Sequence, residues 1–390
     1  MFADIEPGVD DRKAPQATAR SLRDWIADQR EKLLANPKFR SFCVSTPLLR
    51  SITCRRTREL FDVCVGFVYT QTLYACVQSD LLTFVKGSPR CINQISLHTE
   101  LPVEVAERLC RAALSLDLLR QRSDGRYGLG DKGAVVASDK GIEAMVHHHR
   151  LLYRDLTDPL ARLRGTAAPS ELNAFWAYAN NPTASGLNAQ RTNDYSALMA
   201  ASQTMVADEV LKAFSFQGVS RLLDIGGGDG TFVSHVATAH PKLKLGLFDL
   251  PSVIEQAEKR LSIAGHLSRI SVHPGNFARD SLPSGADLVT LVRIVHDHDD
   301  VVVRRLLKAI YDALPVGGRL MIAEPMSETP GAEPIGDAYF GLYLFTMGSG
   351  RPRTMAELRD LCSDTGFVRL NEVPTRNPAL LRILLAQKRS

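Results

Sequence analysis

Cysteine is scarce in this sequence, with seven residues among 390. No two cysteines are separated by two residues, and their number is odd, so neither a zinc site nor a disulfide framework is indicated. We therefore expect thiols that pack in the core of a protein from a reducing compartment. They stand at Cys43, Cys54, Cys64, Cys76, Cys91, Cys110 and Cys362.

Long apolar runs are also missing. The longest uncharged stretch near the N-terminus, residues 63–79, contains threonine and glutamine and is shorter than the roughly 20 apolar residues of a membrane span, which favours a buried helix. The first residues, MFADIEPGVDD, lack the basic-then-apolar pattern of a signal peptide. These absences predict a cytoplasmic protein.

An excess of one charge is absent as well. The net charge of +4 is too small to indicate nucleic acid as a partner, and the hydrophobic content of 45% is ordinary for a soluble protein. A chain of 390 residues is long enough for two domains. Patterning predicts an N-terminal helical arm over 1–60, a helical domain over 61–165, a helical bridge over 166–204 and an α/β domain over 205–390.

The second region predicts a winged helix. Apolar residues recur at helical spacing over 101–119, and Asp124-Gly125 then indicates a two-residue β-hairpin. Winged helices often bind DNA, but this helix carries Glu104, Glu107 and Asp117 against Arg108 and Arg111, a net charge of −1. A helix that reads a groove should be basic, so dimerisation and covering of a substrate are favoured over nucleic-acid binding.

The last region alternates between strand and helix patterns. Strands are predicted over 221–225, 244–248, 269–273, 286–293 and 318–323, with helices over 231–240, 252–261, 301–314 and 354–364 and two closing strands. This alternation predicts a doubly wound, Rossmann-like α/β sheet that is mainly parallel. Such sheets bind ligands beyond the carboxyl ends of their strands.

A glycine-rich turn follows the first of these strands. Asp224 precedes Gly226, Gly228 and Gly230, and Asp249 ends the next strand, where an acid can accept hydrogen bonds from ribose hydroxyls. The spacing is G-x-G-x-G, whereas the dinucleotide fingerprint is G-x-G-x-x-G. Asp224 and Asp229 would repel a diphosphate and attract a sulfonium with an ammonium group, which favours S-adenosylmethionine over a nicotinamide cofactor.

A histidine ends the fourth strand of this region. Methyl transfer to oxygen needs removal of the hydroxyl proton, and His296 is suited to that near neutral pH, although a structural role is the alternative. Asp297, His298, Asp299 and Asp300 resemble a metal cluster, but capping of the following helix is favoured. His147-His148-His149 is interpreted as solvated surface rather than metal site. The aromatic residues between the fifth strand and residue 353 could be core or line an apolar substrate cavity: Tyr339, Phe340, Tyr343 and Phe345.

These motifs resemble the plant-type small-molecule O-methyltransferases, which join a winged-helix dimerisation domain to a Rossmann-like class I methyltransferase domain. The segments that carry the resemblance are Leu223–Gly230, Phe248–Pro251, Gly275–Phe277, His296-Asp297, Gly317-Gly318, Ala323-Glu324 and Arg353-Thr354.

The resemblance implies a role for each matching residue. Gly226 and Gly228 border the methionine part of S-adenosylmethionine, Asp249 holds the ribose, and Leu250 and Phe277 flank the adenine. Asn276 stands where the family usually has Asp, and Arg293 lies beside the position of a family lysine, here Val292. His296 is the base and Glu324 orients it; a second family acid is replaced by Pro352, for which Asp297 is a candidate substitute.

The N-terminal third bears on the substrate. Residues 30–58 carry eight cations and one acid with interleaved apolar residues, which fits either an anionic membrane surface or an arm packed across a dimer. Residues 55–71 resemble the bacterial hydroxyneurosporene, or demethylspheroidene, O-methyltransferases, which methylate the tertiary 1-hydroxyl of an acyclic carotenoid. The alternatives are a phenolic polyketide, a ring carbon of a bacteriochlorophyll precursor, or a non-catalytic ligand-binding or regulatory protein.

Overall fold

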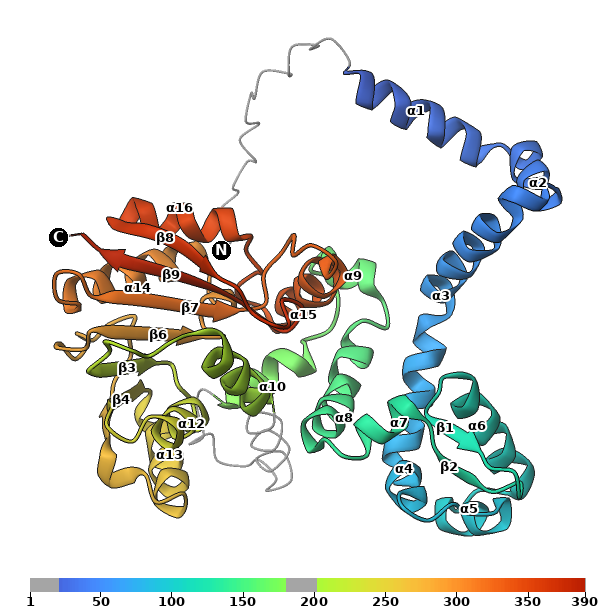
Figure 1. Ribbon diagram of the computed structural model, residues 1–390, viewed down its shortest axis with the longest axis horizontal. Helices are drawn as coiled ribbons and strands as arrows, with labels where there is room; N and C mark the ends of the chain where they lie inside the picture. Colours follow the sequence, from blue (N-terminus) through green and yellow to red (C-terminus); the bar gives the residue numbers. More distant parts are fainter. Residues whose placement is uncertain (1–20, 180–201, 390) are drawn as a thin grey trace, which may run out of the picture. The chain divides into compact units, whose positions relative to one another are not determined.

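The computed structural model describes residues 21–179 and 202–389. The chain divides into two compact units, Met1–Thr72 and Leu73–Ser390, which are treated separately below. The boundary predicted at 60/61 lies 12 residues before this division, and one continuous helix, Pro47–Gln78, runs through both positions (Figure 1).

The first unit consists of three helices, α1 (Leu22–Ala35), α2 (Pro37–Ser45) and most of α3 (Pro47–Gln78). Helix α1 begins at a capping box in which Ser21 and Asp24 satisfy each other's main-chain N–H groups. Asn36 ends α1 and caps α2, and Pro37 at the first position of α2 suits a helix start.

Helix α3 corrects the prediction of a buried helix over residues 63–79. It is 32 residues long, and only Cys76 and Val77 are buried within the chain. Its exposed apolar side chains include Phe61, Val63 and Phe67. Among the described residues it is the one helix long and apolar enough to cross a membrane, by length and composition alone. Cys54 and Cys64 are exposed on it, so the prediction that the cysteines pack in the core holds for Cys76, Cys110 and Cys362 only.

The second unit begins with a small helical subdomain that has its own core. Buried apolar residues from α3, α4, α5, α6 and the following hairpin form it, among them Cys76, Leu81, Ile95 and Cys110. The elements are α4 (Leu81–Val85), α5 (Ile92–Thr99), α6 (Val103–Ser115), β1 (Leu119–Gln121), β2 (Tyr127–Leu129) and α7 (Asp131–Val136).

A helix followed by an antiparallel hairpin appears as predicted for a winged helix. The predicted two-residue turn is instead a three-residue loop, because Arg122 pairs with Arg126 and Gly125 adopts φ +80°. A left-handed residue at the third loop position is the usual geometry of such loops.

Three further helices connect this subdomain to the sheet: α8 (Lys140–Asp155), α9 (Pro159–Leu163) and α10 (Glu171–Ala179). The buried carboxylate of Asp155 accepts hydrogen bonds from the main chains of Glu171 and Leu172 and thereby fixes the start of α10 at the end of α8. More than half of the predicted bridge over 166–204, residues 180–201, lies outside the described residues.

The rest of the second unit is a seven-stranded sheet in the order β5-β4-β3-β6-β7-β9-β8. Every pairing is parallel except those of β9, which is antiparallel to β7 and β8. The predicted alternation of strand and helix is confirmed. The elements are β3 (Arg221–Ile225), α12 (Thr231–Ala239), β4 (Lys244–Asp249), α13 (Pro251–Ile263), η1 (Leu267–Arg269), β5 (Ile270–Pro274), β6 (Leu288–Val292), η2 (Val295–Asp297), α14 (Asp300–Ala313), β7 (Arg319–Glu324), η3 (Pro334–Phe340), α15 (Gly341–Met347), α16 (Met355–Thr365), β8 (Phe367–Val373) and β9 (Arg382–Lys388).

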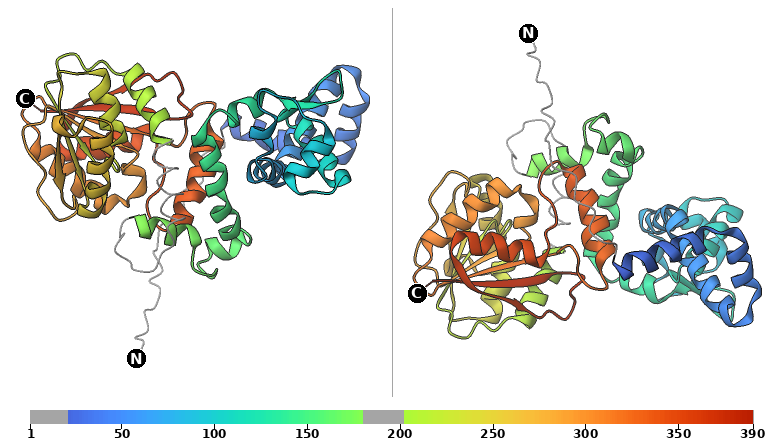
Figure 2. Two further views of the ribbon diagram at one scale, coloured as in Figure 1. Left: turned by 90° about the horizontal axis from the view of Figure 1, so that it is seen from below. Right: turned by 90° about the horizontal axis from the view of Figure 1, so that it is seen from above.

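Helices cover both faces of the sheet (Figure 2). Successive strand residues point to opposite faces, so Leu222 packs with α12 and α13 whereas Leu223 packs with α14 and α16. Because both faces are covered, β6 is buried along its whole length. Because β3, β4, β6 and β7 are parallel neighbours, their carboxyl ends meet at one edge of the sheet. The predicted motifs lie at this edge.

Candidate active site

The glycine-rich turn after β3 adopts the predicted conformation. Gly226 and Gly228 have φ values of +70° and +60°, a region that side chains with a Cβ rarely occupy. A Cβ on Gly226 would also lie 2.5 Å from Cδ1 of Ile294, so the Ile294 side chain would have to shift to admit one. The turn thus brings bare main chain to the carboxyl edge of the sheet.

Asp249, at the end of β4, is tied to that turn. One carboxylate oxygen accepts the N–H of Gly228 at 2.8 Å and the other accepts the N–H of Leu250 at 2.7 Å. Burial raises the pKa of Asp249 to about 6, against the lowering effect of these two hydrogen bonds. Each oxygen keeps a second lone pair for a hydroxyl donor.

Asp224 is fully enclosed beneath the turn. Its Oδ1 accepts a 2.6 Å hydrogen bond from the Thr290 hydroxyl, and its Oδ2 is buried with no partner among the described residues. Burial raises the pKa of Asp224 to about 7. A buried carboxylate oxygen without a donor is costly, so the site suits a ligand that brings a positive or hydrogen-bonding group.

Asp229 was predicted to attract a positively charged ligand, but it already has a cationic partner. Its carboxylate pairs with Arg260 of α13 and accepts hydrogen bonds from the main chain and hydroxyl of Thr231. Because a cation already neutralises it, Asp229 adds little attraction for a cationic ligand. The favourable field comes from Asp224 and Asp249 instead.

The turn after β5 holds the residues predicted to meet an adenine. Asn276 uses its side-chain oxygen to accept the N–H of Ala278 at 2.9 Å, and Asp280 accepts the N–H of Asn276 at 2.7 Å. Phe277 packs edge-to-face on His298, with ring centroids 5.2 Å apart. Phe277 and Leu250 are partly buried.

Arg293 directly follows β6 and has an unusual main chain, φ +59°. Its N–H bonds to the carbonyl of Ala323 on β7, and its guanidinium donates to the Ser202 hydroxyl at 3.1 Å. A left-handed arginine is uncommon and redirects the chain that follows, which carries His296.

His296 lies in the short helix η2 and is 2% exposed. Its Nε2 is 3.3 Å from a carboxylate oxygen of Asp297, and its Nδ1 is buried with no partner among the described residues. The ring packs against Phe340, with centroids 5.8 Å apart. Asp297, predicted as a helix cap or a substitute acid, therefore supplies the carboxylate at the imidazole.

Burial affects the pKa values of His296 and Asp297 more strongly than the contact between their side chains does. It lowers the pKa of His296 well below its usual range, helped by the nearby cations Arg293 and Arg353. It raises the pKa of Asp297 to about 7, although 35% of that side chain is accessible. A lasting ion pair would shift both values the other way, so the imidazole rests in its neutral form. The neutral form is the one that can accept a proton.

Glu324, at the end of β7, contacts His296 through the main chain. Its Oε2 accepts the N–H of His296 at 3.0 Å, while its Oε1 is buried without a partner in the described chain. Burial raises the pKa of Glu324 to about 8. Glu324 thus fixes the position of residue 296, whereas the predicted contact with the imidazole is not formed.

The acids after His296 lie at the start of α14 as predicted, with Asp299 at the cap position and Asp300 in the first turn, but the predicted cap hydrogen bond is not formed. The side chain of Asp299 accepts the N–H of Gly350 instead. Asp300 receives two hydrogen bonds from Arg353, which lower its pKa. These acids therefore also hold a neighbouring segment.

Two histidines of α8 were expected at the surface and are partly buried instead. His148 Nε2 lies 2.7 Å from the Tyr343 hydroxyl, and His149 Nε2 lies 2.8 Å from the Tyr339 hydroxyl. Trp176 of α10 also donates to the Tyr343 hydroxyl at 2.9 Å. We call these five residues the His–Tyr cluster. Its tyrosines stand in η3 and α15, a π-helix followed by an α-helix, and Phe340 between them contacts His296.

The His–Tyr cluster is uncharged near neutral pH. Burial lowers the pKa of His148 to about 4 and that of His149 in the same direction. It raises the pKa of Tyr339 to about 12 and raises that of Tyr343 well above its usual value. The cluster therefore offers aromatic, neutral surface next to the base.

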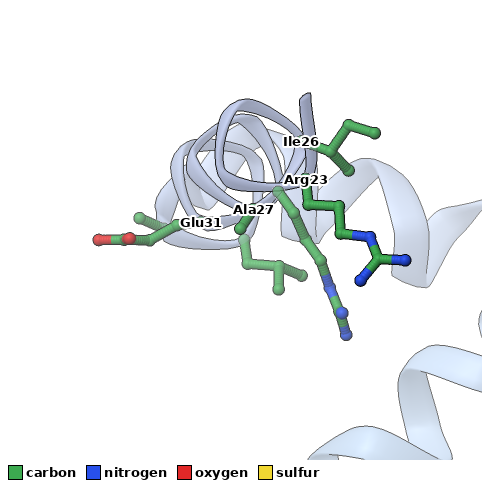
Figure 3. A pocket seen from close by; sticks show the side chains of 7 residues that line it. Arg23, Ile26, Ala27 and Glu31 are labelled. Carbon is green, nitrogen blue, oxygen red and sulfur yellow. The ribbon is translucent and has the colours of Figure 1, made fainter. Parts of the chain in front are cut away.

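A groove of about 650 Å³ lies elsewhere, along one face of α1 (Figure 3). It is lined by Arg23, Ile26, Ala27, Arg30, Glu31, Leu34 and Ala35. A single exposed helix face with mixed charges provides no converging groups, so the groove is not a catalytic site. In the described part of the chain, no three His, Cys, Asp or Glu side chains gather as a metal site would require.

Comparison with known proteins decides the family. Residues 153–368, over half of the chain, match the O-methyltransferase domain family. The chain belongs to this family. It is 39% identical to the demethylspheroidene O-methyltransferase of Cereibacter sphaeroides, over 92% of this chain and 94% of that protein. The corresponding enzyme of Rhodobacter capsulatus is 38% identical over 88% and 85%.

Solved structures confirm the fold of an O-methyltransferase. The mitomycin 7-O-methyltransferase MmcR superimposes with a TM-score of 0.72 at 21% identity, covering 87% of this chain and 99% of that one. Human N-acetylserotonin methyltransferase in complex with S-adenosylmethionine gives 0.71 at 22% identity, covering 86% and 98%. Both have the class I methyltransferase fold that the resemblance implied.

The cofactor of this O-methyltransferase is S-adenosylmethionine, and the residues at the carboxyl edge fit it. The unpartnered oxygen of Asp224 suits an ammonium group, the Gly226–Gly228 main chain can approach closely, and Asp249 keeps lone pairs for ribose hydroxyls. Leu250 and Phe277 offer apolar surface for an adenine. Contacts of Asn276 and Arg293 with the cofactor remain predictions, since the side chains of both already have partners.

Proposed function

We propose that this O-methyltransferase acts on the tertiary 1-hydroxyl of an acyclic carotenoid, of the hydroxyneurosporene or demethylspheroidene type. The observation that carries the proposal is the match over nearly the whole chain to two demethylspheroidene O-methyltransferases. The His–Tyr cluster supports it, because a hydrocarbon substrate needs neutral aromatic surface and offers one polar group.

His296 acts as the general base. Bound S-adenosylmethionine supplies an electrophilic methyl group. A tertiary alcohol is a far weaker acid than a phenol with pKa about 10, so His296 removes the proton as the new bond forms rather than beforehand. The neutral resting form of the imidazole makes this possible, and the carboxyl group of Asp297 at Nε2 favours the transient imidazolium.

A phenolic acceptor is the second candidate. The 3-hydroxy-5-methyl-1-naphthoate 3-O-methyltransferase of Streptomyces sahachiroi is 27% identical over 82% of this chain and 92% of that protein. A phenol would make the base less important, because it ionises near its own pKa.

We also propose that the chain works as a homodimer whose copies meet along the exposed apolar part of α3. Leu60, Phe61, Val63, Phe67 and Val68 are between 47% and 82% exposed, a concentration of apolar surface that is unusual in a monomer. Residues 63–78 of α3 contain no cation, whereas a helix lying on anionic lipid needs cations on its polar face. A second copy therefore suits this segment better than a membrane does.

The basic residues of the arm precede that segment. For the cations among residues 30–58 we propose contact with the anionic surface of the membrane that holds the carotenoid. A cytoplasmic protein bound peripherally in this way would reach a substrate dissolved in lipid.

Mass spectrometry with deuterium-labelled S-adenosylmethionine tests the proposed substrate. Demethylspheroidene is presented in vesicles with or without phosphatidylserine, beside a 3-hydroxynaphthoate in solution. We expect a labelled methyl ether on the carotenoid, formed faster on the anionic vesicles. Methylation of the naphthoate alone would reject the carotenoid proposal, and equal rates on both vesicles would reject the membrane contact.

A further inference from the structure

The loop that carries His296 is held along its length by residues 349–353. Arg353 Nη1 donates to the carbonyl of Val295 at 2.8 Å, and Nη2 donates to the carbonyl of His298 at 2.8 Å. The Ser349 hydroxyl donates to the carbonyl of Asp297 at 2.9 Å. Residues on both sides of His296 are thus fixed by one segment.

Arg353 is the centre of this arrangement. It is 0% exposed and is the largest fully buried side chain in the described structure. Its Nε and Nη2 donate to one oxygen of Asp300 at 3.0 and 2.6 Å. Its own carbonyl accepts the N–H of Ser327, which follows Glu324 on the other side of the site. A buried guanidinium needs such a complete set of partners.

Gly350 shows how closely the segment approaches the base. A Cβ at this position would lie 2.1 Å from the carbonyl oxygen of His296. The main chain of residue 296 therefore has almost no freedom to move toward the segment.

We propose that Arg353 is a positioning residue for His296. Its planar guanidinium holds the two carbonyls that flank the base, at residues 295 and 298, and so sets the direction of the imidazole. The inference rests on the proposed role of His296 as general base. A displacement of about 1 Å at a reacting group can cost roughly 100-fold in rate, so a clamp of this kind has a kinetic effect.

The charge of Arg353 acts on the same residue. Burial lowers the pKa of His296 most, and Arg293, Arg353 and His298 lower it further; the carboxyl group at the imidazole belongs to Asp297, and that of Glu324 accepts the main-chain N–H of the same residue. Loss of the charge should raise the pKa of His296. Because the base works in its neutral form, the acid limb of the rate profile then moves to higher pH.

Two substitutions separate the geometry from the charge. Arg353→Lys keeps the charge but cannot reach both carbonyls with one ammonium; we expect kcat to fall roughly tenfold or more, with KM for both substrates and the acid limb little changed. Arg353→Met loses both, and we expect a larger fall in kcat and an acid limb shifted upward by roughly half a pH unit or more. Arg304→Met, which removes an exposed arginine paired with Asp364, is the matched control and should behave as wild type.

Histidine NMR titration gives a readout that needs no turnover. In protein labelled with ¹⁵N-histidine, with His296→Gln for assignment, the pKa of His296 should rise in Arg353→Met and stay in place in Arg353→Lys. Should Arg353→Met fail to fold, Asp300→Asn weakens the anchor of the guanidinium from a side chain that is 45% exposed, and kcat should fall with KM unchanged. If His296→Gln is inactive while Arg353→Lys and Asp300→Asn are fully active, the proposed positioning role of Arg353 is wrong. If His296→Gln is itself active, the result instead rejects His296 as the base.

Discussion

At the scale of single residues, burial sets the charges at this site more strongly than neighbouring charges do. Asp224, Asp249 and Asp297 all have raised pKa values, and in each case desolvation is the first cause. A carboxylate that is costly to ionise gains most from a ligand that donates hydrogen bonds to its charged form. The cofactor residues are therefore expected to show their contribution in binding rather than in folding.

Asp249→Ala should weaken binding of both S-adenosylmethionine and its demethylated product. Hydrogen bonds to a charged group contribute about 1.5–3 kcal/mol, which corresponds to roughly 10- to 100-fold in Kd. Calorimetry measures this directly, with Asp312→Ala, an exposed acid in an i,i+4 pair, as the control. Unchanged affinity in Asp249→Ala would remove this residue from the cofactor site.

The pH dependence of cofactor binding follows from the same carboxylate. The pKa of Asp249 is raised to about 6, and a ribose hydroxyl donates to the charged form. Binding should therefore weaken as the pH falls through 6 and the carboxyl of Asp249 is protonated, below a first decrease near pH 7 that comes from Asp224. Calorimetry between pH 5 and 8 should show in Asp249→Ala only the decrease near pH 7; an identical profile in both proteins would contradict the assignment.

At the scale of elements, the site depends on how α8, α10, η3 and α15 come together. Their contacts are polar as well as apolar, since Tyr343 joins His148 and Trp176 within one hydrogen-bonded group. A buried polar group of this kind specifies one arrangement of the helices, because any other leaves donors unpaired. The same helices hold Phe340 against His296.

Tyr343→Phe should therefore destabilise the second unit. The change leaves His148 and Trp176 without their shared partner, at a cost of about 1–3 kcal/mol. Thermal unfolding measures this loss of stability. Tyr311→Phe is the control, because it removes the hydroxyl of a tyrosine that packs by its ring on Phe367 and lies outside the His–Tyr cluster. Equal melting temperatures for wild type and Tyr343→Phe would show that the group contributes nothing to stability.

Sequence patterns predicted the local features of the molecule and missed those that depend on distant contacts. The glycine turn, Asp249 and His296 were found because each is tied to the end of a strand. The pairing of His148 with Tyr343 joins residues 195 positions apart, and no periodicity signals it. Arg353 was noticed only as part of a motif, because its partners at residues 295, 298 and 300 become visible only when the loops meet.

At the scale of the whole molecule, the exposed apolar part of α3 favours association with a partner. Apolar side chains that remain in water over several helical turns favour association, as each buried side chain contributes about 1.5–3 kcal/mol. Helix α3 was predicted to be buried because of its composition, and a dimer would bury it without changing the fold of the chain.

Light scattering should give about twice the chain mass of 42.9 kDa at micromolar concentration. Phe67→Glu should shift the protein toward monomer, since it places a charge within the proposed interface. Ile263→Glu is the matched control, because Ile263 is 90% exposed on α13 and lies outside α3. A monomeric wild type, or a dimer that Phe67→Glu leaves intact, would contradict the proposed interface.

The central claim is that His296 removes the proton of a weakly acidic hydroxyl during methyl transfer. The most direct test is kcat of His296→Ala with demethylspheroidene from pH 6 to 10, beside wild type. We expect a loss of roughly 100- to 10,000-fold with cofactor affinity retained, and no recovery as the pH rises, because a tertiary alcohol stays protonated throughout. Near-wild-type turnover at neutral pH would reject His296 as the base, and recovery at high pH would show that the acceptor is an acidic hydroxyl instead.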